Sequence, residues 1–208
     1  MKFILMSNDF SNPETTQEEL GKPLHECRLL FVPNEKASPK QIKGDKFKSK
    51  MAEFGFDSAK VTVLDYYDPE PYADLPIDAI YMSGGNTFAI LYRLKKHGVL
   101  PILQKYIESG VPYIGASAGC HVVGKSIAHV APFDPNNVGL TDFSALGLID
   151  GIFFCHYGEA RRPYYEQAVK DGTYKAYTIP NGTSLVFHDS TLVRTVVGEP
   201  YTPKGDNQ

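Results

Sequence analysis

The chain has 208 residues, of which 42% are hydrophobic and 22% are charged. This composition excludes the disordered and fibrous classes, and the length suits a single α/β domain over residues 1–208. The formal net charge of −3 gives no electrostatic footprint for a polyanion, so we expect no nucleic acid partner.

The first half of the chain alternates short apolar runs with segments of helical spacing. The apolar runs have the length and the β-branched or aromatic bias of buried strands. Strands that alternate with helices predict a mostly parallel sheet covered on both faces, which is a three-layer α/β/α fold. The predicted strands are residues 3–6, 28–32, 61–64, 79–82 and 113–114, and the predicted helices are residues 39–54, 87–98 and 100–108.

The last third of the chain has a different pattern. Residues 152–155 are an apolar run that leads into His156, and residues 163–169 are typical of a short helix. Three more strands are predicted at 174–179, 184–188 and 192–197, with a two-residue hairpin turn between the last two. The tail over 200–208 is polar, contains Pro and Gly, and is expected to fray.

The segment from Gly115 to Gly119 matches the G-x-S-x-G pattern of a nucleophile elbow. It follows an apolar strand and precedes small residues that can begin a helix. The glycines allow a tight strand-to-helix turn, which leaves the hydroxyl of Ser117 exposed above the edge of the sheet. Since ligands of such sheets bind beyond the carboxyl ends of the strands, the sequence predicts a nucleophilic serine there.

A second glycine-containing turn, residues 83–87, follows the neighbouring predicted strand. Its paired glycines leave backbone N–H groups free to face a ligand. Gly85 and Ala118 are therefore candidates for the two donors of an oxyanion hole. Asn86 and Thr87 are candidates for substrate binding, and equally for capping the helix that begins there.

A serine hydroxyl needs a general base, and the chain offers six histidines. His156 ends a very apolar strand, where a sheet delivers a side chain into a site. His121 lies one turn into the helix after Ser117 and is expected to pack along that helix, and His129 lies in a predicted strand. The other three lie in surface or distal contexts. His156 is therefore the favoured base.

Three separated segments, Gly84–Phe88, Tyr113–Gly119 and Cys155–Tyr157, together resemble the peptidase S51 family in order and spacing. The resemblance runs from the first strand to about Phe187. It implies a flavodoxin-like fold related to the class I glutamine amidotransferases, with the serine and histidine above as nucleophile and base. It also implies an acyl-enzyme and an oxyanion hole made by the Gly85 and Ala118 amides.

The resemblance offers two positions for the third member of a catalytic triad. Counting back from His156, the family's acid between serine and histidine corresponds to Asp134, whereas counting forward from Ser117 gives Pro132. A second family acid lies in a Pro-acid-Gly turn, where this chain has Asn181. Asn181 carries no charge, but its amide oxygen can orient a histidine ring. Both residues stay candidates.

The resemblance also bears on the substrate. The family includes peptidases that prefer an N-terminal aspartyl residue, and a Gly-Glu-x-Arg segment after their histidine resembles Gly158–Arg161. A guanidinium forks well onto a carboxylate, so Arg161 or Arg162 is a candidate reader of an acidic side chain. Ordinary surface arginines are the alternative. A small peptide is the expected substrate.

Other functions remain open at this stage. An α/β-hydrolase esterase shares the elbow, but it places its acid after a further strand and helix. A binding or regulatory protein that retained the fold and lost hydrolysis is suggested by Asn181. A cysteine nucleophile at Cys120 is disfavoured because the elbow holds serine and the pattern buries Cys120 in the following helix.

The remaining features point to a reducing compartment. Three cysteines at irregular spacing argue against a disulfide framework and a zinc site, so we expect neither a metal nor another cofactor. The apolar N-terminal run is too short for a signal sequence or a membrane span. We expect a cytoplasmic protein that contacts no membrane and is a monomer or a homodimer.

Overall fold

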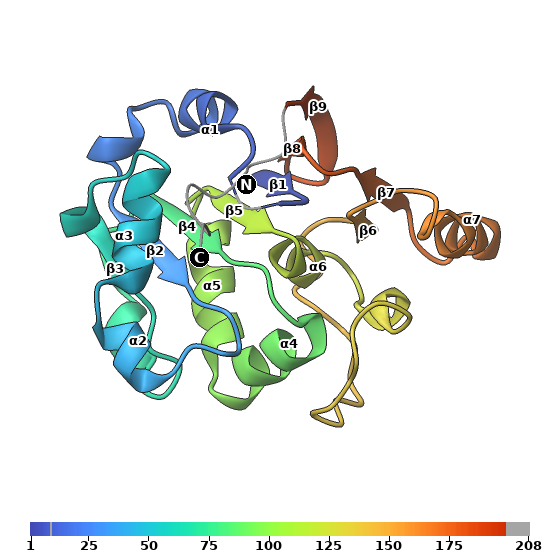
Figure 1. Cartoon of the computed structure of the whole chain (residues 1–208), viewed down its shortest axis with the longest axis horizontal. Coiled ribbons are helices and arrows are strands. Elements are labelled where there is room, and N and C mark those ends of the chain that lie inside the picture. The colour runs from blue at the N-terminus through green and yellow to red at the C-terminus, as the bar shows by residue number, and fades with distance from the viewer. Residues whose placement is uncertain (9, 199–208) are drawn as a thin grey trace, which may run out of the picture.

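The computed structural model of the chain describes residues 1–8 and 10–198. Within these residues, the centre is a seven-stranded sheet in the order β3-β2-β4-β5-β1-β8-β9 (Figure 1). Its strands are β1 (Lys2–Met6), β2 (Leu29–Val32), β3 (Val61–Val63), β4 (Ala79–Met82), β5 (Tyr113–Ala116), β8 (Thr183–His188) and β9 (Thr191–Val197).

The direction of the strands changes at β1. From β3 to β1 all neighbours are parallel, whereas β8 is antiparallel to β1 and β9 is antiparallel to β8. The carboxyl ends of the five parallel strands therefore share one edge of the sheet. That edge is where a parallel sheet binds its ligands.

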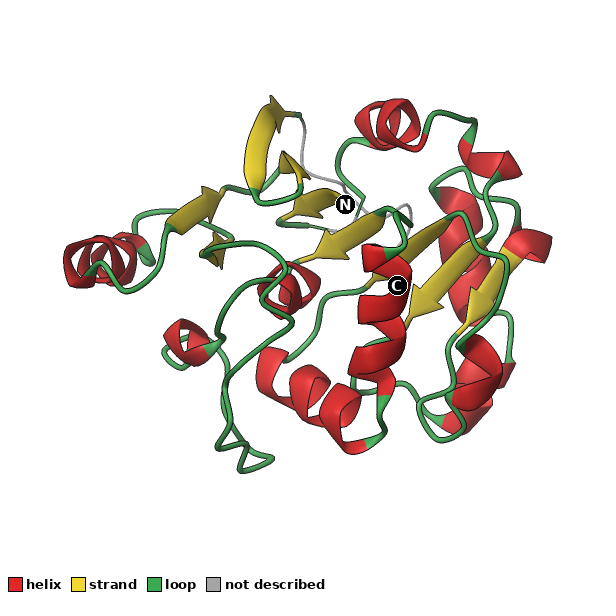
Figure 2. Ribbon diagram, turned by 180° about the vertical axis from the view of Figure 1, so that it is seen from behind, coloured by secondary structure: helices red, strands yellow, loops and turns green. Residues whose placement is uncertain are grey.

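Helices cover both faces of this sheet, as Figure 2 shows. Alternate residues of β1 illustrate the layering, because Phe3 and Leu5 pack into one buried cluster and Ile4 and Met6 into another. The first cluster includes side chains of α4 and α5, and the second includes side chains of α2 and α3. The helices are α1 (Pro13–Leu20), α2 (Pro39–Lys43), α3 (Lys46–Glu53), α4 (Thr87–Lys96), α5 (Val99–Glu108), α6 (Ala118–Val123) and α7 (Arg162–Asp171).

A second, smaller sheet lies beside the antiparallel end of the large one (Figure 1). Its two strands, β6 (Ile152–Cys155) and β7 (Ala176–Ile179), are parallel. An aromatic cluster joins the sheets: the ring of Phe187 in β8 lies 5.9 Å from that of Phe153 and 5.1 Å from that of Tyr177. This packing fixes the place where β6 ends, and His156 follows directly.

The predicted three-layer α/β/α class with a mostly parallel sheet is confirmed, and β4 and β6 have the predicted bounds. The single helix over 39–54 is wrong, because α2 ends at Gly44, whose extended backbone separates it from α3. His129 lies in a 3₁₀ turn (Ala128–Val130) rather than in a strand. Helix α1 was not predicted, since its sequence, PETTQEEL, is almost wholly polar.

Two further expectations concern the ends of the chain and the membrane. The frayed tail over 200–208 lies outside the described residues. Among the described helices, none combines the length and the apolar composition that crossing a bilayer requires.

Candidate active site

Ser117 occupies a strained turn between β5 and α6. Its backbone has φ of 49° and ψ of −107°, in the half of the map that residues other than glycine rarely enter. The N–H of Ser117 donates a 2.8 Å hydrogen bond to the carbonyl of Met6, the last residue of β1. The nucleophile elbow is thus tied to the carboxyl ends of two neighbouring parallel strands.

The two glycines of the elbow are required by packing. A Cβ at Gly115 would lie 2.9 Å from the carbonyl group of Gly119, and a Cβ at Gly119 would lie 2.6 Å from the carbonyl oxygen of Met82. Such contacts are closer than real Cβ atoms adopt. The buried hydroxyl of Tyr113 also donates a 2.8 Å hydrogen bond to the Gly119 carbonyl. The G-x-S-x-G spacing therefore serves the close approach of strand, turn and helix.

His156 brings its ring to the serine from the smaller sheet. It follows β6 directly, and its φ of 51° is also unusual for a residue with a side chain. Its Nε2 lies 2.9 Å from the Oγ of Ser117, which is hydrogen-bonding distance. A serine and a base in such contact form the minimal unit of nucleophilic catalysis.

The far side of the His156 ring contacts Asn181. The distance from Nδ1 to the amide oxygen of Asn181 is 2.8 Å. Asp134 lies elsewhere: its carboxylate accepts a 2.7 Å hydrogen bond from the N–H of Thr87, and none of the hydrogen bonds described for this chain joins it to His156. The structure thus brings Ser117, His156 and Asn181 together in a row and leaves Asp134 outside it.

The turn after β4 lies against Ser117. A Cβ at Gly84 would lie 3.2 Å from the Cβ of Ser117, so the two loops are in contact. Gly85 has φ of 155°, and a Cβ there would collide with the carboxylate of Glu35. Ala118 is the first residue of α6, so its N–H has no acceptor within the helix. Ala118 thus adjoins Ser117 in the chain, and Gly84, the neighbour of Gly85, contacts the Ser117 side chain. The roles of Gly85 and Ala118 as oxyanion donors stay predictions.

Asn86 and Thr87 serve the start of α4. The Asn86 side chain accepts a 2.9 Å hydrogen bond from the N–H of Ala89, and its amide nitrogen donates to the carbonyl of Pro135. This is the capping role that the sequence allowed. Thr87 is buried. Substrate binding by these two residues stays a prediction.

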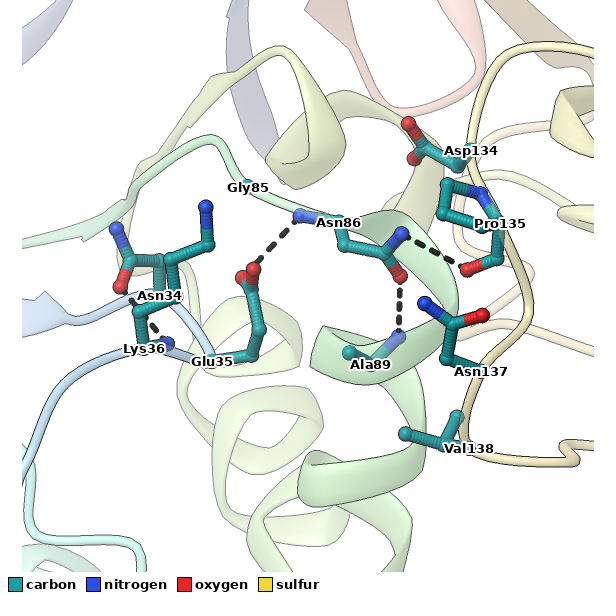
Figure 3. Close-up of a pocket in the computed structure, with 10 residues that line it drawn as sticks. All are labelled: Asn34, Glu35, Lys36, Gly85, Asn86, Ala89, Asp134, Pro135, Asn137 and Val138. Atoms are coloured by element: carbon teal, nitrogen blue, oxygen red, sulfur yellow. Dashed lines mark hydrogen bonds between the residues drawn. The ribbon is translucent and has the colours of Figure 1, made fainter.

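A pocket of about 550 Å³ opens beside Gly85 (Figure 3). Two carboxylates line it, Glu35 from the loop after β2 and Asp134 from the loop after α6, together with one ammonium group, that of Lys36. Glu35 accepts a 3.1 Å hydrogen bond from the N–H of Asn86. The pocket is therefore adjacent to a predicted oxyanion donor, and its lining carries two acidic side chains against one basic side chain.

The other histidines near the elbow are not in contact with Ser117 in the hydrogen bonds described. His129 is largely buried, and burial lowers its pKa to about 3. One of its ring nitrogens, Nε2, lies 2.6 Å from the carbonyl oxygen of Phe153. The buried ring of His121 packs against it, with 5.2 Å between the ring centres. Neither ring has a hydrogen bond to Ser117 among those described.

Cys120 is a poor nucleophile. Its thiol is completely buried, and its sulfur lies 3.3 Å from each of two possible acceptors, the carbonyl oxygens of Met6 and Gly115. Burial raises its pKa well above the ordinary value. Since the reactive form of cysteine is the thiolate, the structure disfavours Cys120 as the nucleophile, as the pattern had indicated.

The two arginines after His156 differ in environment. The Arg161 guanidinium stacks over the ring of Phe133 at 4.2 Å and donates one hydrogen bond to the carbonyl of Cys155, the residue directly before His156. Partial burial lowers its pKa, although a guanidinium stays protonated in proteins. Arg162 is more exposed and pairs with Glu159. Arg161 is therefore the arginine held next to the site.

The sequence prediction omitted two residues that the structure places here. Ser7 is fully buried directly after β1, where its hydroxyl contacts both the backbone of His156 and the side chain of Asn181. Glu35 is partly buried and lies after β2, separated from it by Pro33 and Asn34. The usable signal was position alone, since both are polar residues just beyond the carboxyl end of a predicted parallel strand.

Comparison with known proteins gives a consistent result. A family model described as peptidase family S51 matches residues 3–195. Peptidase E of Pasteurella multocida (strain Pm70) is 33% identical over 140 residues, which are 60% of this chain and 58% of that protein. Peptidase E of Shewanella denitrificans is 30% identical over 148 residues, 70% of this chain and 61% of the other. The matched part of this chain thus spans less than two thirds of each relative.

Two solved structures resemble this chain over nearly its whole length. A crystal structure of a candidate peptidase E protein from Listeria monocytogenes EGD-e covers 94% of this chain and 98% of its own, with a TM-score of 0.74 and 25% identity. A peptidase from an acI-B1 actinobacterium covers 95% and 94% with a TM-score of 0.63. At 17% identity, the second supports the fold alone.

The packing of the elbow gives a first prediction. Gly119→Ala places a methyl group 2.6 Å from the Met82 carbonyl oxygen, so β4 and α6 must separate. We expect the free energy of unfolding, measured in urea, to fall by about 1 to 3 kcal/mol. Gly158→Ala is the matched control, because a Cβ there meets no atom within 4 Å. Equal stability of the two variants would contradict this account of the motif.

Proposed function

The chain belongs to peptidase family S51, a family of serine peptidases, and from that premise we propose that it hydrolyses small peptides through an acyl-enzyme on Ser117. The observation that carries the proposal is the 2.9 Å contact between the Oγ of Ser117 and the Nε2 of His156. The substrate and the individual roles below are parts of the same proposal.

The chemistry follows from this contact. Ser117 attacks the scissile carbonyl carbon while His156 takes the hydroxyl proton, and the peptide bond then breaks as the ring returns that proton to the leaving amine. Water, deprotonated by the same ring, attacks the acyl carbon. The bond from that carbon to the Oγ of Ser117 then breaks, and the ring returns its proton to Oγ as the acid product leaves. The N–H groups of Gly85 and Ala118 stabilise the oxyanion in both halves of the reaction.

Asn181 takes the third position in this scheme. Its amide oxygen accepts from Nδ1 of the ring, which orients His156 as an aspartate would. A neutral oxygen stabilises the imidazolium less than a carboxylate does. Asp134, the other candidate from the sequence, instead accepts a hydrogen bond from the N–H of Thr87 at the start of α4, where a helix favours a negative charge.

The surroundings favour a peptide with a free amino terminus and an acidic first residue. A carboxylate has about four lone-pair positions, so Glu35 and Asp134 retain capacity for an ammonium group in the pocket beside Gly85. Arg161 has donors left over after its single bond to the Cys155 carbonyl. A guanidinium in that state suits the side-chain carboxylate of an aspartyl residue.

Two other functions are weighed against this one. A protein that lost hydrolysis is disfavoured by a serine and a histidine that still meet at hydrogen-bonding distance. A small-ester hydrolase shares the same chemistry, and the charged groups of the pocket argue for a charged substrate instead. The cytoplasmic location and the monomeric or homodimeric state stay predictions from the sequence.

Removal of either reacting group tests the core of the proposal. We expect Ser117→Ala and His156→Ala each to lower kcat/KM for dipeptide hydrolysis by several orders of magnitude, on the order of 4 to 8 kcal/mol in the barrier. A fluorophosphonate probe should label the native chain and spare Ser117→Ala. Ser49→Ala, which alters an exposed helical serine, is the control. Unchanged turnover in both active-site variants would refute the scheme.

The neutral third residue gives a second test. Asn181→Asp places a negative charge against the imidazolium that forms in the transition state, so we expect kcat to rise and the acidic limb of the pH–rate profile to move to higher pH. Asn137→Asp adds the same charge at an exposed position of the pocket, away from the ring. If both variants change the profile equally, Asn181 has no special relation to His156.

The role of Arg161 is tested by comparing two dipeptides, Asp-Leu and Ala-Leu. In Arg161→Met we expect kcat/KM for Asp-Leu to fall roughly 10- to 100-fold, the scale of one charged hydrogen bond, and that for Ala-Leu to change much less. Arg162→Met is the matched control on the exposed neighbour. Equal losses for both dipeptides would mean that Arg161 only supports the backbone of Cys155.

A further inference from the structure

The direction of each hydrogen bond around His156 can be derived from its backbone N–H, a group that can only donate. The backbone N–H of His156 points at the hydroxyl oxygen of Ser7. A backbone amide nitrogen only donates, so the Ser7 oxygen must accept this bond. The Ser7 hydroxyl then has one proton of its own to give.

The acceptor for that proton is the amide oxygen of Asn181, 3.2 Å away. Since Ser7 is fully buried, an unused hydroxyl proton would carry a desolvation cost. The bond therefore selects one of the two flipped orientations of the Asn181 amide, the one with its oxygen toward Ser7. No other hydrogen bond of the Asn181 side chain is described.

The same oxygen lies 2.8 Å from Nδ1 of His156. An amide oxygen only accepts, so Nδ1 must carry the ring proton. In the neutral ring Nε2 is then unprotonated, and its lone pair faces the hydroxyl of Ser117. This is the tautomer that can take a proton from the serine.

We propose that Ser7 is a positioning residue that selects the tautomer of His156. The backbone N–H of His156 fixes the direction of the Ser7 hydroxyl, and the hydroxyl fixes the orientation of the Asn181 amide. The amide oxygen in turn keeps the ring proton of His156 on Nδ1. The inference rests on the proposed function for its catalytic consequence, although the tautomer itself is measurable without turnover. Ser7 touches no reacting atom.

The alternative orientation shows why Ser7 is needed. If the Asn181 amide were flipped, its NH₂ group would donate to Nδ1 and also face Ser7, and the buried Ser7 proton would lose the one acceptor described for it. Nε2 would then carry the proton and could not act as base. Without Ser7, nothing described around the Asn181 side chain distinguishes the two orientations.

The turn that carries Asn181 has supports of its own. The N–H of Gly182 donates a 3.2 Å hydrogen bond to the side-chain oxygen of Asn8, and the Gly182 carbonyl accepts from Asn12. Loss of the Ser7 hydroxyl should therefore leave the turn in place and affect the orientation of the amide within it.

The direct test is the protonation pattern of His156 by ¹⁵N NMR in the Ser117→Ala chain, which removes the serine as a partner. With Ser7 present we expect the proton on Nδ1. In the Ser7→Ala, Ser117→Ala chain we expect a mixture of tautomers, restored toward Nδ1 by Ser7→Thr, which retains a hydroxyl. An unchanged tautomer in the Ser7→Ala chain would overturn the proposal, whether or not the protein is a peptidase.

Kinetics give the second readout. We expect Ser7→Ala to lower kcat about tenfold or more with little change in KM, tenfold being equivalent to about 1.4 kcal/mol. The loss should be much smaller in an Asn181→Asp background, because a carboxylate presents only acceptors and needs no selection. A purely structural role for Ser7 predicts the same loss in both backgrounds, and that result would overturn the proposal.

Ser184→Ala is the matched control for these measurements. Ser184 is also a fully buried serine at the same end of the sheet, and its hydroxyl accepts a hydrogen bond from Asn12. It should lower stability without changing the tautomer or the kinetic comparison. If Ser7→Ala does not fold, Ser7→Cys retains the volume with a much weaker donor and gives the same comparison.

Discussion

The hydrogen bond between Ser117 and His156 is the contact on which the rest of this structure depends, because its two partners come from different sheets. The serine follows β5 in the large sheet, and the histidine follows β6 in the small one. A shift of about 1 Å between the sheets would break a bond of 2.9 Å. The aromatic rings of Phe153, Tyr177 and Phe187 that join the sheets thus act, at a distance, on the chemistry of the site.

The end of β1 stabilises both halves of this contact. Met6 accepts from the backbone N–H of Ser117, and Ser7 accepts from the backbone N–H of His156. Both donors belong to residues with positive φ, a conformation that costs roughly 1 to 3 kcal/mol at each site. The last residue of one central strand and the residue that follows it therefore hold the two strained turns in the orientation that lets their side chains meet.

Sequence reasoning gave the positions of Ser117 and His156 in the fold because their determinants are local, whereas their catalytic roles stay predictions. The elbow around Ser117 is specified by its own glycines, and His156 by the apolar strand that precedes it. Sequence reasoning was less informative where the determinant is the path of a long loop. Whether Asp134 reaches the His156 ring depends on the conformation of residues 124–151 between α6 and β6. Counting residues along the chain does not give that conformation. The continuous helical pattern over 39–54 likewise hid the break at Gly44.

Ser7 was missed for a different reason. A serine after an apolar strand is common. The role of Ser7 depends on the parallel pairing of β1 with β5 and on the position of β6, which belongs to the other sheet. Neither is encoded near residue 7. Only when three distant segments are placed together does one hydroxyl contact both the backbone of His156 and the amide of Asn181.

The neutral side chain at position 181 has a consequence that a carboxylate would not have. Both oxygens of an aspartate accept, so any orientation toward a histidine ring selects the same tautomer. An asparagine presents an acceptor on one side and a donor on the other, so the orientation of its amide determines which histidine tautomer is selected. That orientation must therefore itself be fixed. In this fold the obligatory donor of the His156 backbone fixes it through Ser7, which explains how a site without a third carboxylate can still present a basic nitrogen to its serine.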